Sequence, residues 1–344
     1  MVALFSGQDK NKNGGIMKIL KTLAASSAVF FMSAGAFAAG LDFTTLGTKI
    51  AENPNYIADT INPGLGDFAE QLAISIPQAA TQQNVWADAY IGKSFPSVPP
   101  HFGGGVNMAL THIDTSGLAE AASALGIDNI EDSYYFPCFT ADLRVGGVLL
   151  PFDVDIAVMK TGTIDTSVFG SDLSVDFFTI GADVRYALLE GGLIFPKLSV
   201  GAGYFYNQGT FGASSDNGSA TIDYKVHTLY GQVQVSKSFL LFTPFLGLRG
   251  LVSKYDNTYD WEYKGSYASQ IEAAASLLGK TVETKGSGSY KSDAFDFGGI
   301  QPQVFAGVGV NFLVLQATLS VSADLRNLGD SGLWSGAFSF RAKL

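Results

Sequence analysis

Cysteine, histidine and charge are all scarce in this chain, which has one cysteine, three histidines and 15% charged residues. The lone Cys138 cannot form an internal disulfide, so stability has to come from sheet closure and packing. His101, His112 and His227 show no His-x-x-x-His or Cys/His spacing, so neither a metal site nor a cofactor is predicted. The formal net charge of −10 argues against a nucleic-acid partner or an anionic surface.

Long apolar runs are also missing, because none after residue 40 is long enough to be a transmembrane helix. The chain instead alternates. In the stretch 315–325 the odd positions are all apolar and the even positions are all polar. Successive side chains of a strand point to opposite faces, so this stretch predicts a strand with one apolar and one polar face. At about 3.3 Å per residue and a tilt of roughly 45°, it is long enough to cross the hydrocarbon core of a bilayer.

The same alternation predicts about twelve strands, with ten or fourteen as open alternatives. The expected strands lie at 70–76, 85–91, 102–113, 138–147, 152–158, 177–189, 196–206, 222–236, 242–252, 301–311, 315–325 and 338–344. The first of these, around Leu72, is the one that makes the number even. Within 222–236 the apolar face changes sides near His227 and Thr228, which predicts a β-bulge.

The N-terminus carries the pattern of an export signal. Lys18 and Lys21 precede a short apolar core, and a small-x-small site then predicts cleavage after Ala38. The part before Met17 precedes a natural-looking start of translation. Residues 1–38 are therefore interpreted as an over-extended start followed by a signal peptide.

Residues 39–69 form a second unit, which we expect to be helical. Pro54 and Pro63 break it into short amphipathic pieces with too few apolar residues for a core of their own. The segment must therefore rest on another part of the chain, either as a plug inside a lumen or as a periplasmic segment. Residues 70–344 are the expected barrel.

Connections between the expected strands alternate between short and long. The short ones lie near 95–100, 148–151, 190–195, 237–241 and 312–314, and the long ones near 114–135, 162–173, 211–220, 256–296 and 327–334. Up-and-down membrane barrels have short periplasmic turns on one rim and long loops on the other. Two of the long loops contain expected helical pieces, at 117–125 and 270–278.

These features favour a membrane barrel over a secreted soluble β-protein, in which the apolar faces would point inward. Strand length, the alternation of loop length and the signal peptide decide between the two. Unpaired backbone groups are costly in lipid, so the sheet has to close. The predicted fold is all-β: a closed antiparallel up-and-down transmembrane β-barrel with a short helical N-terminal segment.

The signal peptide, the alternation over residues 70–344 and the C-terminal strand resemble those of porin-like bacterial outer-membrane β-barrel proteins. The resemblance implies location in the outer membrane of a bacterium with a double envelope, with outer-membrane lipid and the insertion machinery as partners. That machinery recognises a C-terminal aromatic residue, whereas this chain ends in Leu344, with Phe338 and Phe340 on the same face. The helical segment is loosely similar to the plug of long-chain fatty-acid transporters, which typically have fourteen strands. A homo-oligomer stays compatible with this pattern.

The polar faces of the strands should line a lumen that carries charges of both signs. The charged pore-lining candidates are Asp142, Arg144, Asp153, Asp155, Asp183, Arg185, Lys197, Arg249, Asp324 and Arg341. The aromatic pore-lining candidates, which would offer apolar contact to an amphiphile, are Trp86, Tyr90, Phe177, Phe205, Phe245 and Phe305. Such a lumen would discriminate solutes by charge and size.

The predicted function is an outer-membrane channel for the passive passage of small solutes or amphiphiles. One alternative is a transporter of hydrophobic ligands such as fatty acids, with the N-terminal segment as its plug. Another is a surface adhesin or structural outer-membrane protein that uses its long loops. No enzyme is expected, because Asp153 and Asp155, on one strand face across from Arg144, are interpreted as balancing lumenal charge rather than as an acid–base pair.

Overall fold

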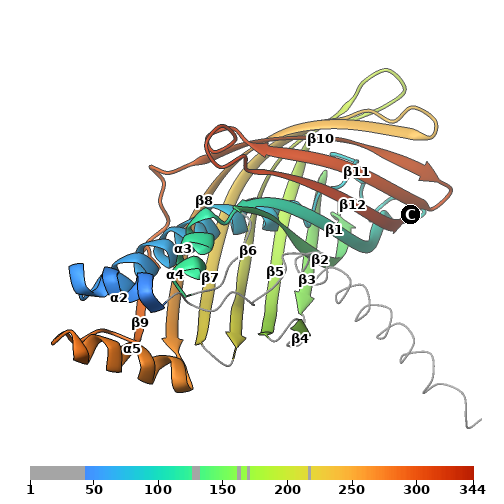
Figure 1. The fold of residues 1–344 in the computed structure, drawn as a ribbon. Helices are drawn as coiled ribbons and strands as arrows, with labels where there is room; N and C mark the ends of the chain where they lie inside the picture. The colour runs from blue at the N-terminus through green and yellow to red at the C-terminus, as the bar shows by residue number, and fades with distance from the viewer. Residues whose placement is uncertain (1–42, 126–131, 161–163, 169–170, 216–217) are drawn as a thin grey trace, which may run out of the picture.

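The computed structural model describes residues 43–125, 132–160, 164–168, 171–215 and 218–344 (Figure 1). The helices are α2 (Phe43–Glu52), α3 (Tyr56–Thr81), α4 (Ser116–Ala124) and α5 (Gly265–Leu277). The strands are β1 (Phe102–Asp114), β2 (Ser133–Gly146), β3 (Phe152–Lys160), β4 (Ile164–Val168), β5 (Ser171–Glu190), β6 (Lys197–Ser215), β7 (Gly218–Ser236), β8 (Phe242–Tyr263), β9 (Lys285–Lys291), β10 (Gln301–Phe312), β11 (Leu315–Asp324) and β12 (Trp334–Lys343). The helices expected in two long loops are confirmed as α4 and α5, whereas the proposed signal peptide lies outside the described residues.

Ten strands form a closed ring in the order β8-β10-β11-β12-β1-β2-β3-β5-β6-β7, with β7 returning to β8. Every pairing in the ring is antiparallel. The short strands β4 and β9 extend β5 and β8 outside the ring. The predicted closed antiparallel barrel is confirmed, with ten strands in its ring, one of the numbers that the alternation left open.

The outer face of the ring is apolar and the inner face is polar. Leu319 and Val184 are among the exposed side chains of the outer face, while Arg185 and Asp324 are buried inside. A soluble sandwich would have the reverse arrangement. The apolar outer face therefore belongs to lipid, which matches the membrane interpretation.

Two strands expected near the N-terminus are wrong. The segment 70–76 lies within α3, and 85–91 belongs to an irregular segment that precedes β1. Leu72 and Ile76 are buried on α3 together with Leu65, a spacing of four and seven residues that fits one face of a helix. A short apolar stretch fits a strand and a helix equally well, and packing inside the barrel decided for the helix. The break expected at Pro63 is also wrong, since Pro63 lies within α3.

The bulge expected near His227 is wrong as well. Strand β7 pairs with β6 and β8 in unbroken register through Thr228, so no extra residue is inserted. Ile222 and Tyr224 point inward on the same face as Thr228, and Asp223 is exposed outside. The apolar pattern changes sides although the strand does not turn over. Beyond the membrane the inner face packs on helices and is apolar, whereas the outer face meets water and is polar.

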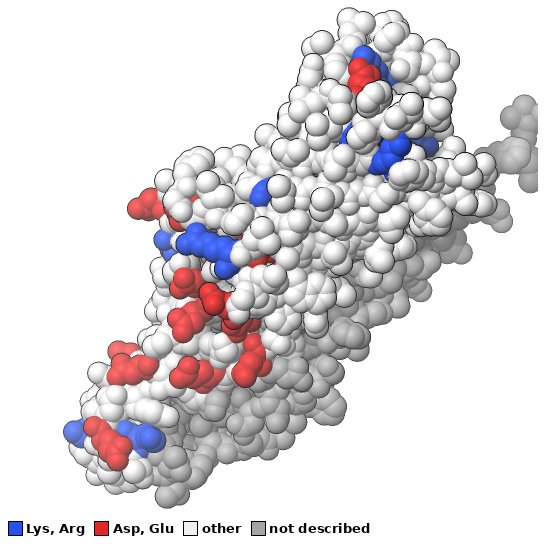
Figure 2. Space-filling view, turned by 90° about the horizontal axis from the view of Figure 1, so that it is seen from above, with Lys and Arg blue, Asp and Glu red and all other residues white. Residues whose placement is uncertain are grey.

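Strands β5 to β8 extend past the lipid-facing band. Strand β8 has 22 residues, whereas β11 has ten. On the outer face of β8 the apolar residues end at Val252, and Asp256 and Asp260 follow as exposed residues. Figure 2 shows most of the charged side chains toward one end of the molecule, a smaller group at the opposite end, and a broad, almost uncharged band between them. This charge boundary marks one edge of the membrane.

Helix α3 runs through the barrel from the long-loop end, where α2 and α4 lie, toward the short-turn end (Figure 1). The crossing of α3 and α4 is close, since a Cβ on Gly64 would lie 2.4 Å from the carbonyl oxygen of Gly117. Residues 82–101 continue without regular structure until β1 begins. No helix in the described ranges is long and apolar enough to cross a membrane.

Candidate functional site

The lumen of the barrel is occupied by the segment 82–93, which we call the plug segment. Four arginines of the wall surround it, and each donates at least one hydrogen bond to a backbone carbonyl of the plug segment or of Thr81 just before it. The four are Arg144, Arg185, Arg249 and Arg341, and each side chain is buried. A buried guanidinium needs acceptors for its donors, and here the plug segment supplies some of them.

Arg341 and Arg144 hold the first half of the plug segment around Trp86. Arg341 donates to the carbonyl of Val85 over 2.7 Å and forms an ion pair with Asp142. The two guanidinium groups lie 4.5 Å and 5.5 Å from the ring centroid of Trp86, within the range of cation–π attraction. The indole is thus held between two wall arginines.

Arg144 also holds the second half. It donates to the carbonyls of Asp88 and Ala89 over 2.8 Å and 3.1 Å. Its ion pair with Asp153 measures 2.8 Å, and the same carboxylate accepts from the backbone N–H of Ile91 over 3.1 Å. One wall ion pair therefore binds both the donors and the acceptors of the plug backbone.

Arg185 and Arg249 hold the start of the plug segment. Arg185 donates to the carbonyl of Asn84 over 2.8 Å and pairs with Asp183 over 2.8 Å. The Asn84 amide in turn donates to that carboxylate over 2.5 Å. Arg249 donates to the carbonyl of Thr81, at the end of α3. The junction between helix and plug segment is thus bound to the wall.

Asp88 is the plug residue with the most charged partners. Its carboxylate pairs with Lys197 over 3.0 Å and with Lys343 over 2.5 Å, and it accepts from Gln316 over 3.0 Å. The side chain is almost fully buried, so its negative charge depends on these partners. Asp88 is not among the residues that the sequence singles out, and no local pattern could single it out, because its partners lie far away in the sequence.

The remaining charged candidates are placed differently. Asp155 faces the lumen opposite Asp183 in the pairing of β3 with β5. The Asp324 carboxylate accepts from the backbone N–H groups of Arg326 and Asn327 over 2.9 Å and 3.1 Å. It shapes the loop that follows β11.

The aromatic candidates fall into two groups. Trp86 and Tyr90 belong to the plug segment, whereas Phe205, Phe245 and Phe305 face the lumen from the wall. Phe205 stacks on Tyr230 at a centroid distance of 6.2 Å.

Phe177 lies nearer the long-loop end, where its ring packs against Phe136 at 6.3 Å. The structure therefore gathers five of the six in the mid-lumen around the plug segment and leaves Phe177 outside that group.

Helix α3 is held by an apolar cluster above the plug segment. Ile61 and Leu65 of the helix are fully buried in a cluster that includes Ile222 and Trp261 of the wall. Polar contacts add to it, because the Trp261 indole donates to the Asn62 side chain over 2.8 Å. Two contacts thus close the lumen. The upper contact, nearer the long-loop end, is apolar, and the lower contact, nearer the short-turn end, is ionic and hydrogen-bonded.

Several buried polar atoms between plug and wall have no hydrogen-bond partner among the described residues. They include both carboxylate oxygens of Asp155 and the side-chain amides of Gln82 and Gln83. An unpaired buried polar group costs about 1–3 kcal/mol. The lower contact is therefore less completely satisfied than an ordinary protein core.

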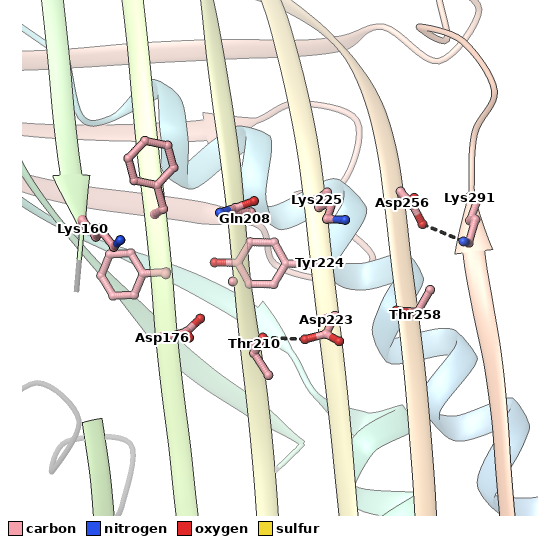
Figure 3. Close-up of a pocket in the computed structure, with 13 residues that line it drawn as sticks. Lys160, Asp176, Gln208, Thr210, Asp223, Tyr224, Lys225, Asp256, Thr258 and Lys291 are labelled. Atoms are coloured by element: carbon pink, nitrogen blue, oxygen red, sulfur yellow. Dashed lines mark hydrogen bonds and ion pairs between the residues drawn. The ribbon is translucent and has the colours of Figure 1, made fainter. Parts of the chain in front are cut away.

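A separate hollow of about 530 Å³ lies on the projecting part of the sheet (Figure 3). It is lined by residues of β3 and β5 to β9, among them Lys160, Lys225, Asp223 and Asp256. Asp256 pairs with Lys291 over 2.9 Å. Both charge signs are present and mostly exposed, and no plug residue lines this hollow.

The closed ring, the uncharged outer band and the polar lumen define a bacterial outer-membrane β-barrel of the porin-like kind. No family model matches the chain, and no curated protein matches it.

Similar solved structures include the translocator domain of the autotransporter NalP from Neisseria meningitidis, with 11% identity, 71% of this chain and 88% of that chain covered, and a TM-score of 0.33. The transport unit of the autotransporter AIDA-I from Escherichia coli has 8% identity, 81% and 98% coverage, and a TM-score of 0.24. A mutant porin of Rh. blastica has 11% identity, 71% and 99% coverage, and a TM-score of 0.18.

Proposed function

We propose that this barrel is an outer-membrane channel for small solutes or amphiphiles that is kept closed by its own N-terminal segment. In this proposal the channel opens when residues 82–93 leave the lumen or shift within it. The observation that carries the proposal is the set of wall arginines bound to the plug backbone. These residues would line the passage once the plug segment has moved.

The chemistry of the lower contact supports a segment that can be displaced. Hydrogen bonds from Arg144 and Arg185 to plug carbonyls can be replaced by hydrogen bonds to water, so the net contribution of each is limited to about 1.5–3 kcal/mol. Unpaired groups such as the Asp155 carboxylate would gain hydration on opening. The mixed charges and rings of the wall suit a polar solute or an amphiphile with a charged head.

The test is single-channel conductance in planar bilayers with the variant Asp88→Asn. The change removes the charge that binds Lys197 and Lys343 and keeps the size of the side chain. The wild-type protein should conduct rarely, and the variant should open more often.

The matched control is Asp256→Asn, because Asp256 forms an exposed ion pair outside the lumen. It should behave like the wild type. A wild-type barrel that conducts steadily, or an Asp88→Asn variant that is as closed as the wild type, would contradict closure by the plug segment.

A role of the long loops in surface binding is a second candidate, favoured by the ordered projection that β8, α5 and β9 form beyond the membrane. Grafting residues 256–296 onto another barrel would test it. Transfer of partner binding with the graft is the expected result, and loss of binding only when the lumen is changed would contradict it.

A further inference from the structure

The short turns of the barrel carry large apolar side chains that point away from the protein. Four segments form this feature, which we call the apolar crown: 148–150, 193–195, 239–242 and 312–314. Leu193 and Leu240 are 98% exposed and Leu313 is 90% exposed. None of the four segments contains a charged residue. Exposed apolar residues gathered in this way mark an interaction surface.

Three of the crown leucines have a strained backbone. Leu149, Leu240 and Leu313 have φ of 66°, 46° and 55°, and no other non-glycine residue in the described ranges has a positive φ. The left-handed region disfavours leucine, and glycine or asparagine would fit such a turn without strain. A large apolar side chain at three turn tips, kept against this strain, indicates that the side chain itself has a role.

Part of the turn backbone is hydrogen-bonded within a turn or to a neighbouring turn. Phe239 and Phe242 exchange two backbone hydrogen bonds of 2.6 Å and 2.7 Å. The Lys237 ammonium donates to the carbonyls of Gly192, Leu193 and Phe195 over 2.8, 2.8 and 3.1 Å. In lipid each unpaired backbone group is costly, so turns with internal partners suit an apolar surrounding.

The crown continues the lipid-facing band of the strands. On β8 the outward residues are uncharged from Phe242 to Val252, and Leu240 lies just beyond the strand. From Leu240 to Val252 the chain rises by about 30 Å at ~3.3 Å per residue and a tilt of ~40°. An outer-membrane barrel has an apolar band of about 25 Å, so this uncharged stretch is long enough to span the band with the crown at its short-turn edge.

From these observations we infer that the apolar crown is a lipid-binding surface. The acyl chains of the leaflet at the short-turn end cover the turn tips and anchor this rim of the barrel. Lipid is the occupant that fits, because the four turns are distributed around the ring and lipid surrounds the ring on every side. A folded protein partner would cover one side of the rim, and it is an outcome that the experiments below would detect.

The first experiment measures the depth of a crown residue in the membrane. An environment-sensitive fluorophore is attached to the variant Leu240→Cys in vesicles of phosphatidylethanolamine and phosphatidylglycerol. The native Cys138 is buried, so labelling of the folded protein is directed to the new thiol. The control is Asp256→Cys, on the outer face of the same strand at the long-loop end.

The probe at Leu240→Cys should be quenched by lipids brominated on the acyl chain and be insensitive to aqueous iodide. The probe at Asp256→Cys should show the reverse. Iodide quenching without lipid quenching at Leu240→Cys would place the crown in water, overturn the inference and leave a protein partner as the remaining occupant.

The second experiment removes the crown without adding backbone strain. The triple variant Leu149→Asn, Leu240→Asn and Leu313→Asn keeps residues that tolerate positive φ. Its rate of insertion into preformed vesicles should fall by more than about tenfold, because the burial of three leucine side chains in lipid is lost. Its melting temperature in detergent should not fall.

The matched control replaces exposed apolar residues at the opposite end, with Leu277→Asn, Leu278→Asn and Phe297→Asn. Its insertion rate should equal that of the wild type. Equal loss in both triple variants, or no loss in the crown variant, would overturn the inference. Because neither experiment measures conductance, failure of the crown and failure of the proposed closure are distinguishable.

Discussion

Glycines on the lumen face of the wall lie against large rings of neighbouring strands. A Cβ on Gly247 would lie 2.1 Å from the ring of Phe305, and one on Gly181 would lie 2.1 Å from the ring of Phe205. Because these rings are themselves buried, they have little room to move. The lack of a side chain at these glycines is therefore what allows the rings to pack inside the barrel.

Replacing Gly247 by alanine should lower the free energy of unfolding by about 1–3 kcal/mol, because the added methyl group overpacks a filled interior. Unfolding by urea in detergent micelles measures the change. Gly192→Ala is the matched control, since no atom lies within 4 Å of its Cβ position. Equal stability of the two variants would show that the ring of Phe305 can move aside.

A second residue-scale prediction concerns charge selectivity. In the Asp88→Asn background, Arg185→Gln removes a positive charge from the lumen and leaves Asp183 in place, so selectivity should shift toward cations. The reversal potential in a salt gradient measures it. Lys225→Gln removes the same charge from the outer face and should not shift the potential. If Arg185→Gln leaves selectivity unchanged, Arg185 does not line the passage.

The path of α3 and the plug segment through the lumen determines on which side of the membrane the start of α3 and the end of the plug segment lie. Helix α3 begins beside α2 at the long-loop end, and the plug segment reaches the short-turn end, where Phe95 bridges to Val148. An epitope inserted before Phe43 should therefore be accessible from the side of the 256–296 loop.

Protease digestion of sealed vesicles with uniformly oriented protein measures this accessibility. A second epitope in that long loop serves as the positive control. Cleavage of the loop epitope with protection of the one before Phe43 would contradict the path through the lumen.

Elements differ in how far their own residues predict them. Strand β11 follows directly from its alternation, because one face meets lipid and the other meets the lumen along its whole length. Strand β7 misleads, because its inner face is polar beside the plug segment and apolar beside α3. The two-residue period of a strand shows that its two faces have different surroundings. It does not show that the surroundings of one face change along the length of the strand.

At the scale of the whole molecule, stability rests on closure of the ring, in which the first strand β1 pairs with the last strand β12. The chain has a single cysteine, which is buried. We expect the same thermal transition with and without a reducing agent, measured by heat-modified migration in detergent gels. A transition that falls in reducing agent would show that an intermolecular disulfide contributes to stability.

The sequence by itself determined the closed antiparallel barrel, its two-faced strands and the inward direction of charged residues such as Arg144 and Arg341. These follow from local alternation, which depends only on the two-residue period of a strand and on the difference between lipid and water. Only the tertiary structure decided that the lumen is filled, that residues 70–76 are helical and that Asp88 binds Lys197 and Lys343. Each of those depends on contacts between residues far apart in the chain, which no local pattern contains.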